Sequence, residues 1–287
     1  GGGGAGAAIA AAVAPDETAY DLLRSLKSCR STGLPCVDAH LPGGLGPSEL
    51  VVLHGEAGAA KSALLQSIIA EHIAPSALGG HALPAVMIDT DGAFDVGRLG
   101  MLLEARAARR AAGGGGAPEL VKEALSRLLV LCPEEPIDLL RQLRQLREVL
   151  GANPAASLIA VDAMTAWQPF SGVFSRTVTA VLKECWSALA RLQRELCVAV
   201  VAVQRDLNLD GIPSNYGFGG ADCSGLANTC HLSIMRRLPG MPNQEGIRGD
   251  AACETFQVTS RAQGPEEAPT PVAFAFTRTG EVVGVPS

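Results

Sequence analysis

An eight-residue segment has the composition and spacing of a phosphate-binding loop. It lies between an apolar run and a helical pattern, and it reads Gly55-Glu56-Ala57-Gly58-Ala59-Ala60-Lys61-Ser62. A loop in this position points backbone N–H groups at phosphate oxygens, at the N-terminus of the following helix. Lys61 is then placed to reach the β- and γ-phosphates, and Ser62 to bind Mg²⁺. The segment therefore predicts a site for ATP and Mg²⁺.

One residue of this loop departs from the usual pattern, which has a glycine where Ala60 stands. If the position requires a positive φ, alanine costs about 1 kcal/mol there, because its Cβ crowds the backbone. The loop is thus strong evidence for the fold and leaves the nucleotide affinity open. A loop of the right shape that binds nucleotide weakly is the alternative.

Polar residues end three other apolar runs. Asp162 closes the run Ser-Leu-Ile-Ala-Val-Asp and is a candidate Mg²⁺ ligand. Asp91 closes Met-Ile-Asp-Thr-Asp and is a candidate to orient an attacking water. Gln204 follows a valine-rich run, where its amide is a candidate sensor of the γ-phosphate. Each pattern alone also fits an ordinary polar strand end. Beside the phosphate loop, they predict catalytic roles for Asp91 and Gln204, and metal binding by Ser62 and Asp162.

Apolar runs and helical patterns alternate along most of the chain. The runs predicted to be buried strands are 50–54, 84–89, 127–132, 157–162 and 196–203. Helical spacing of apolar residues predicts helices over 61–73, 136–150 and 176–195. Short strands separated by turn residues are predicted over 253–260, 270–276 and 280–285. This order predicts an α/β fold: a mostly parallel twisted sheet with helices on both faces and a C-terminal antiparallel extension.

The organisation of the chain follows from composition. Residues 1–16 are predicted to be a disordered Gly/Ala tail rather than a signal peptide, because a basic start is lacking. Residues 17–46 are predicted to form a short helix and a linker, with the helix packed on the core or docked on a partner. The remaining residues, 47–287, form the core. The Ala/Arg/Gly stretch 104–118 is interpreted as a flexible solvated loop.

Charge and hydropathy limit the partners. The net charge is −6, whereas a free-standing DNA-binding domain is usually basic. Any contact with DNA is therefore expected to be local or shared with another subunit. The glycine-rich loop 205–230 is one candidate, since Tyr216 or Phe218 in it is able to stack on a base. No apolar run reaches the roughly 18 residues of a membrane span, so no membrane partner is expected.

The eight cysteines include no CxxC pair, and several lie in apolar runs. This usage favours a reducing compartment, the cytosol or the nucleus. A zinc site is conceivable at four residues in the C-terminal third: Cys223, Cys230, His231 and Cys253. Their spacing fits no common zinc pattern, and a zinc site is not expected.

From about residue 31 to the end, the chain resembles the RecA-like recombinases in their eukaryotic branch. GEAGAAKS is similar to the family's Walker A motif and LIAVD to its Walker B motif. The sequence Ile-Asp-Thr-Asp stands where recombinases have Ile-Asp-Thr-Glu, so Asp91 occupies the catalytic glutamate position. Gln204 matches the glutamine that senses the γ-phosphate. The resemblance implies a RecA-like P-loop ATPase core, and the short segment before Ser31 favours the paralogues that do not form filaments.

The resemblance also implies a function. Such paralogues are subunits of hetero-oligomeric complexes that assist the loading of a recombinase on single-stranded DNA during double-strand break repair. The implied partners are other paralogues and single-stranded or branched DNA, and the implied location is the nucleus. Ala60 and the shorter Asp91 predict slow or absent ATP hydrolysis, since misplacement by about 1 Å can cost a hundredfold in rate. The alternatives are an active strand-exchange recombinase and an unrelated P-loop kinase or signalling ATPase, whose arginine-bearing lid would be 104–118.

Overall fold

The fold was analysed in a computed structural model of the 287-residue chain. The residues it describes are 29–41, 43–110, 117–152, 157–167, 176–205, 229–236, 255–260, 271–277 and 281–284. The predictions made for 1–16, for the helix within 17–28 and for most of the loop 205–230 lie outside these residues. Cys223 and Cys253 also lie outside them.

A single sheet of nine strands organises the described residues. Its order is β3-β2-β4-β5-β1-β6-β7-β8-β9. The parallel strands are β1 (Leu50–Gly55), β2 (Ala85–Asp89), β3 (Leu128–Leu131), β4 (Leu158–Asp162), β5 (Ala199–Arg205) and β6 (Thr229–Arg236). The antiparallel strands are β7 (Thr255–Ser260), β8 (Val272–Phe276) and β9 (Val282–Gly284). The mostly parallel sheet and its antiparallel C-terminal extension are confirmed.

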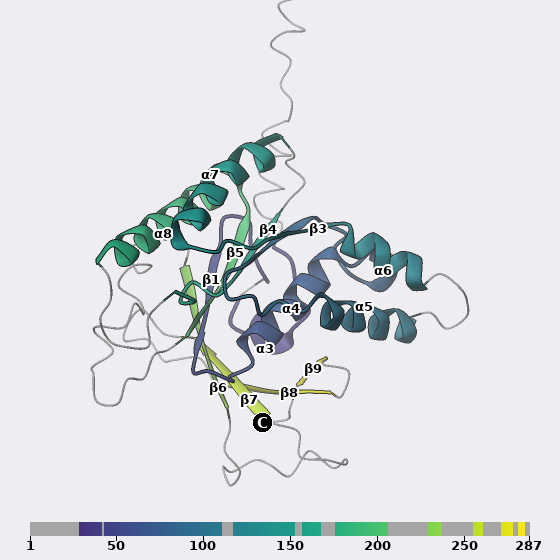
Figure 1. The fold of residues 1–287 in the computed structure, drawn as a ribbon. Helices are drawn as coiled ribbons and strands as arrows, with labels where there is room; N and C mark the ends of the chain where they lie inside the picture. Colours follow the sequence, from purple (N-terminus) through teal and green to yellow (C-terminus); the bar gives the residue numbers. More distant parts are fainter. Residues whose placement is uncertain are drawn as a thin grey trace, which may run out of the picture.

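Helices cover both faces of this sheet (Figure 1). One face carries α3 (Pro35–Asp38), α4 (Lys61–Ile73), α5 (Val96–Arg110) and α6 (Ala117–Leu125), with the 3₁₀ helix η1 (Ser76–Leu78) after α4. The other face carries α7 (Pro136–Ala152) and α8 (Arg176–Leu196), which lie side by side. No described helix is both long and apolar enough to cross a membrane.

The alternation of side chains along each strand builds the two cores. On β1, Val51 and Leu53 join the core under α4, whereas Leu50 and Val52 join the core under α7 and α8. All four side chains are fully buried. A strand buried on both faces needs apolar residues at every position, which is why the central strands read as continuous apolar runs.

The prediction of a solvated loop over 104–118 was wrong for most of that stretch. Residues 104–110 continue α5, and residues 117–118 begin α6; only 111–116 fall outside the described residues. The helix forms because it buries one apolar stripe, made of Leu99, Leu102, Leu103 and Ala107. Alanine and arginine are also strong helix formers.

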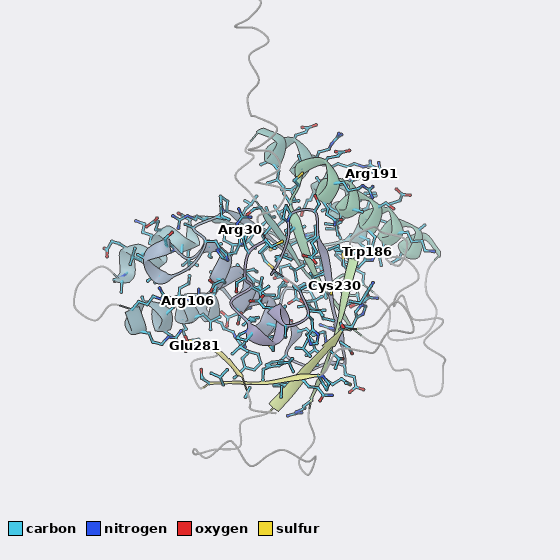
Figure 2. The ribbon with its side chains drawn as sticks, turned by 180° about the vertical axis from the view of Figure 1, so that it is seen from behind. Arg30, Arg106, Trp186, Arg191, Cys230 and Glu281 are labelled. Carbon is cyan, nitrogen blue, oxygen red and sulfur yellow. The ribbon has the colours of Figure 1, made fainter. Side chains whose placement is uncertain are left out.

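Ion pairs fix the outer part of α5. Arg106 Nη1 lies 2.6 Å from Glu71 Oε2 on α4, and Arg109 pairs with Glu281 beside β9. Figure 2 shows Arg106 and Glu281 on this side of the molecule, away from Trp186 and Arg191 of α8. Arg106 is therefore part of the helix packing and does not extend into solvent.

Two more features were missed in the sequence. Strand β6 follows the loop predicted over 205–230, so that Thr229 and Cys230 belong to a strand, as does Arg205 in β5. The chain before β1 is also built into the fold, since an isolated bridge joins Arg30 to Leu45. Between them, Leu34, Val37 and Leu41 are buried in the core under α4.

Candidate functional site

The predicted site residues gather where the parallel strands end. The register aligns Asp89 at the end of β2 with Asp162 at the end of β4. It also aligns Gly55 of β1 with Arg205 of β5. Because the carboxyl ends of parallel strands meet at one edge, these side chains share the region in which α/β sheets bind ligands. The strand alternation places Asp89, Asp162 and Arg205 on the α4 face.

Two residues of the predicted phosphate loop, Gly58 and Ala60, have left-handed backbone angles. Gly58 has φ +79°, and Ala60, which immediately precedes α4, has φ 62° and ψ 18°. The substitution of glycine by Ala60 thus falls on a left-handed residue, where a side chain is strained. Gly55 is required for a different reason: a Cβ there would lie 2.3 Å from the backbone oxygen of Ile234 on β6.

Lys61 lies across the loop that precedes it. Its Nζ donates hydrogen bonds to the carbonyl oxygens of Gly55, at 2.8 Å, and Glu56, at 2.6 Å. The side chain is buried, with 5% of its surface exposed. The ammonium group is therefore held inside the loop, at the place from which a P-loop lysine contacts phosphate.

Ser62 and Asp162 are brought together as the sequence predicts for two magnesium ligands. Asp162 is 4% exposed. Burial raises the pKa of Asp162 above its ordinary value of 3.8, and the hydroxyl of Ser62, which lies close to the carboxylate, opposes that shift. Asp91 and Asp89 raise the pKa further by repulsion, while the charge of Arg205 lowers it. A hydroxyl and a carboxylate oxygen suit Mg²⁺, so the donor set fits the predicted ion.

The two carboxylates of the sequence Ile-Asp-Thr-Asp have different partners. Asp89 accepts hydrogen bonds from the backbone N–H groups of Ala93, at 3.2 Å, and Phe94, at 3.1 Å. It therefore shapes the turn that leads from β2 toward α5. Asp91 instead forms an ion pair with Arg205, whose Nη2 lies 2.6 Å from Asp91 Oδ2.

Two threonines, which the sequence analysis did not single out, join the strand ends. Thr90 Oγ1 donates to the oxygen of Ala163 at 2.6 Å and accepts from its N–H at 2.7 Å. Thr165 Oγ1 accepts from the N–H of Arg205 at 3.1 Å. Arg205 was also missed as a site residue, although its place directly after Gln204 was a signal that it lies at the same edge.

Gln204 is placed differently from the carboxylates. It is buried, with 3% exposed, and its register partner on β1 is His54. Val200 and Ala202 of the same strand belong to the core under α7 and α8, so the alternation places Gln204 on that face. On the same face, His54 Nε2 lies 2.7 Å from Nδ1 of His231 on β6. Cys230 and His231 are thus strand residues, and the described residues contain no cluster of three metal-ligating side chains.

Comparison with known proteins agrees with this architecture. No protein-family model matches the chain. It is 28% identical over 173 residues to the DNA repair protein XRCC2 of Mus musculus, covering 59% of this chain and 60% of that protein. The chain has a RecA-like core. Its predicted resemblance to RecA-like recombinase paralogues is confirmed at modest identity.

Archaeal proteins match a similar share of the chain. The DNA repair and recombination protein RadB of Thermococcus onnurineus is 27% identical over 175 residues, 61% of this chain and 68% of that protein. RadB of Thermococcus gammatolerans is 30% identical over 141 residues, 47% of this chain and 52% of that protein. The aligned region therefore spans between about half and two thirds of each relative.

Proposed function

We propose that this chain acts in DNA repair by homologous recombination, as a RecA-like paralogue that binds Mg·ATP and hydrolyses it slowly or not at all. The observation that carries the proposal is that Lys61, Ser62 and Asp162 gather at the carboxyl edge of a RecA-like sheet, with Ser62 close enough to Asp162 to lower its pKa. The names of the relatives, XRCC2 and RadB, support a role in repair and recombination.

The residues of the loop divide the work of nucleotide binding. Backbone N–H groups at the start of α4 would bind the phosphates. Lys61 would exchange its two backbone carbonyls for phosphate oxygens, at little cost in hydrogen bonds. Ser62 and Asp162 would hold Mg²⁺, which supplies the positive charge that the terminal phosphates require.

Slow hydrolysis follows from Asp91. Its side chain is one methylene shorter than that of glutamate, so the reach of the carboxylate toward an attacking water is reduced. Misplacement by about 1 Å can cost a hundredfold in rate. We therefore favour a nucleotide-responsive subunit over an active strand-exchange recombinase.

The arginines of the 104–118 stretch argue against a kinase. Arg106 and Arg109 are engaged with Glu71 and Glu281, and the guanidinium of Arg110 lies against Gly79. A kinase lid would place arginines over the phosphate loop. These three arginines instead contact residues on α4, after η1 and beside β9.

The wider role is part of the same proposal. Because the net charge is −6, we expect the chain to reach single-stranded or branched DNA as a subunit of a hetero-oligomer with other recombinase paralogues, in the nucleus. Cells lacking the chain should be sensitive to double-strand breaks and form fewer recombinase foci at them. Normal resistance and normal foci in such cells would contradict the repair role.

Calorimetric titration with Mg·ATP tests the nucleotide site directly. We expect the parent protein to bind in the micromolar range and Lys61→Ala to bind about a hundredfold more weakly, since an ion pair with phosphate is lost. Lys122→Ala is the matched control, because it removes an exposed lysine of α6. If the parent and Lys61→Ala both fail to bind, the nucleotide role is wrong and the chain acts through its interfaces alone.

A further inference from the structure

The ion pair of Arg205 with Asp91 stands directly at the candidate nucleotide site. It joins the ends of β2 and β5 across β4, because the strand order is β2-β4-β5. The strand that it crosses is the one that ends in Asp162. The charge of Arg205 is close enough to act on that carboxylate. The guanidinium therefore acts on both Asp91, just beyond the end of β2, and Asp162, at the end of β4.

The structure holds this ion pair in place from both sides. The backbone of Arg205 is fixed by Thr165 and by its register with Gly55, the first residue of the phosphate loop. The second oxygen of Asp91 accepts the N–H of Ala93 at 3.3 Å. The Asp91 side chain is 15% exposed and that of Arg205 is 38% exposed. The carboxylate of Asp91 is thus less exposed than the guanidinium of Arg205, although Asp91 as a whole residue is exposed.

Elsewhere in the same site, the ammonium group of Lys61 is directed into the loop, and the Ser62 side chain lies close to Asp162. Arg205 is a cation on the α4 face whose backbone lies beside the first residue of the loop. Its charged group rests on the residue at the position of the catalytic carboxylate. In P-loop ATPases that position faces the terminal phosphate, so an anion bound there would compete with Asp91 for the guanidinium.

We propose that Arg205 distinguishes ATP from ADP: Asp91 holds its guanidinium in reserve, and Arg205 moves from Asp91 to the terminal phosphate when ATP binds. The inference rests on the proposed nucleotide binding and concerns the same site. Arginine suits the role, because its planar group binds a carboxylate and a phosphate with the same geometry. Asp91, once released, remains beside the cation that Ser62 and Asp162 would hold.

The exchange gives the two residues opposite effects on the affinity for ATP. Arg205 strengthens ATP binding through the terminal phosphate, which ADP lacks. Asp91 weakens ATP binding, because its ion pair must be broken first. Removing Asp91 should therefore favour ATP only while Arg205 is present. This dependence of one substitution on the other is what a double-mutant cycle measures.

The test is calorimetric affinity for Mg·ATP and Mg·ADP in the parent, Arg205→Gln, Asp91→Asn and the double variant. We expect Arg205→Gln to weaken ATP binding about tenfold and ADP binding less than about twofold. Asp91→Asn should strengthen ATP binding about fivefold, the equivalent of a half-exposed ion pair, and the double variant should lose that gain. Arg205→Lys should restore part of the preference, since it keeps the charge.

Arg141→Gln is the matched control, because Arg141 forms an Arg–Asp pair with Asp138 on the exposed surface of α7. It should leave both affinities unchanged. An unchanged ratio of ATP to ADP affinity in Arg205→Gln would overturn the inference, as would an equal gain from Asp91→Asn with and without Arg205. The parent separates the two proposals: if it binds ATP and depends on Lys61, nucleotide binding stands whatever Arg205 does. If the parent binds no nucleotide, both proposals are wrong.

Discussion

The two ends of the central sheet both bury titratable groups, and they do so in opposite ways. At the amino end, His72 of α4 lies 2.7 Å from the hydroxyl of Ser157, just before β4. The cavity beside this pair has a volume of only about 20 Å³, enough for about one water. At the carboxyl end, Asp89 and Asp162 are buried, and the charge of Arg205 acts on Asp162.

The difference lies in how each end treats charge. Burial lowers the pKa of His72 to about 3, helped by the charges of His81 and Arg30, so the imidazole stays neutral. Burial raises the pKa of Asp162, yet Ser62 and Arg205 act against that shift. At the amino end His72 is thus kept neutral, as in a stable core, whereas at the carboxyl end the charged form of Asp162 is partly stabilised despite its burial. Retained charge at a strand end is what a site for an anion and a metal requires.

The largest expected effect comes from the contact that joins the phosphate loop to β6. Gly55→Ala should lower the free energy of unfolding by about 3 kcal/mol or more, because the new Cβ would lie 2.3 Å from the backbone oxygen of Ile234. Urea denaturation measures it. Gly58→Ala is the control: it has a positive φ but no atom within 4 Å of its Cβ, and should cost about 1 kcal/mol. Equal losses in both variants would show that the close approach to β6 is unimportant.

The second expected effect is a dependence of the free energy of unfolding on pH, caused by His72 at the amino end of the sheet. The pKa of His72 is lower in the folded chain than in the unfolded chain. As the pH falls below about 6.5, His72 therefore binds a proton in the unfolded chain but remains neutral in the folded chain. Stability should therefore decrease by up to about 1.4 kcal/mol for each pH unit, between about pH 6.5 and 3. Urea denaturation at pH 7, 6 and 5 measures the slope. His72→Gln should flatten it; a slope that survives this substitution would place its origin elsewhere.

At the carboxyl end, the ionisation of Asp162 is expected to have a smaller effect on stability, and here lowering the pH should stabilise the fold rather than destabilise it. Since the pKa of Asp162 is raised when folded, its charge destabilises the fold at neutral pH, and this cost disappears as the pH falls through the folded pKa. Asp162→Asn should therefore raise stability at pH 7 by about 1 kcal/mol without nucleotide, because it removes a buried charge while keeping a polar side chain. Thermal unfolding with and without Mg·ATP checks both this gain and the loss of the stabilisation by ligand. A loss of stability without nucleotide would contradict the contrast between the two ends.

The smallest effect is the strain at Ala60. Ala60→Gly should stabilise the protein by about 0.5 kcal/mol, because relief of the left-handed backbone slightly exceeds the added flexibility of the unfolded chain. Ala59→Gly is the control and should destabilise it, since Ala59 has no positive φ. Denaturation midpoints compare the two variants. Destabilisation by both would mean that Ala60 is not strained.

The sequence was sufficient for the parts of the fold that local patterns encode. The helical spacing over 61–73 predicted α4 with the same bounds, and the apolar run 157–162 predicted β4 within one residue. The sequence was less reliable where its composition suggested a loop and the chain forms a helix. Glycines 113–116 suggested a loop, although the stripe beginning at Leu99 was enough to make α5 a helix.

The candidate site divides in the same way. The sequence alone determined the phosphate loop, with Lys61 and Ser62 at its end, because eight consecutive residues encode its shape. It also placed Asp162 at the end of a strand and Asp91 two residues beyond one, because an apolar run that ends in aspartate is a local signal. The roles predicted for these residues and for Gln204 remain predictions.

Only the tertiary structure decided which of these residues meet. Asp91 and Arg205 are 114 positions apart, and their contact depends on the order β2-β4-β5. The insertion of β6 beside β1, which makes Gly55 necessary, likewise depends on a pairing between distant strands. The physical reason is that the position of a side chain along a strand is set by local periodicity, whereas its neighbours are set by which strands pair. That pairing depends on the burial of both faces of the whole sheet.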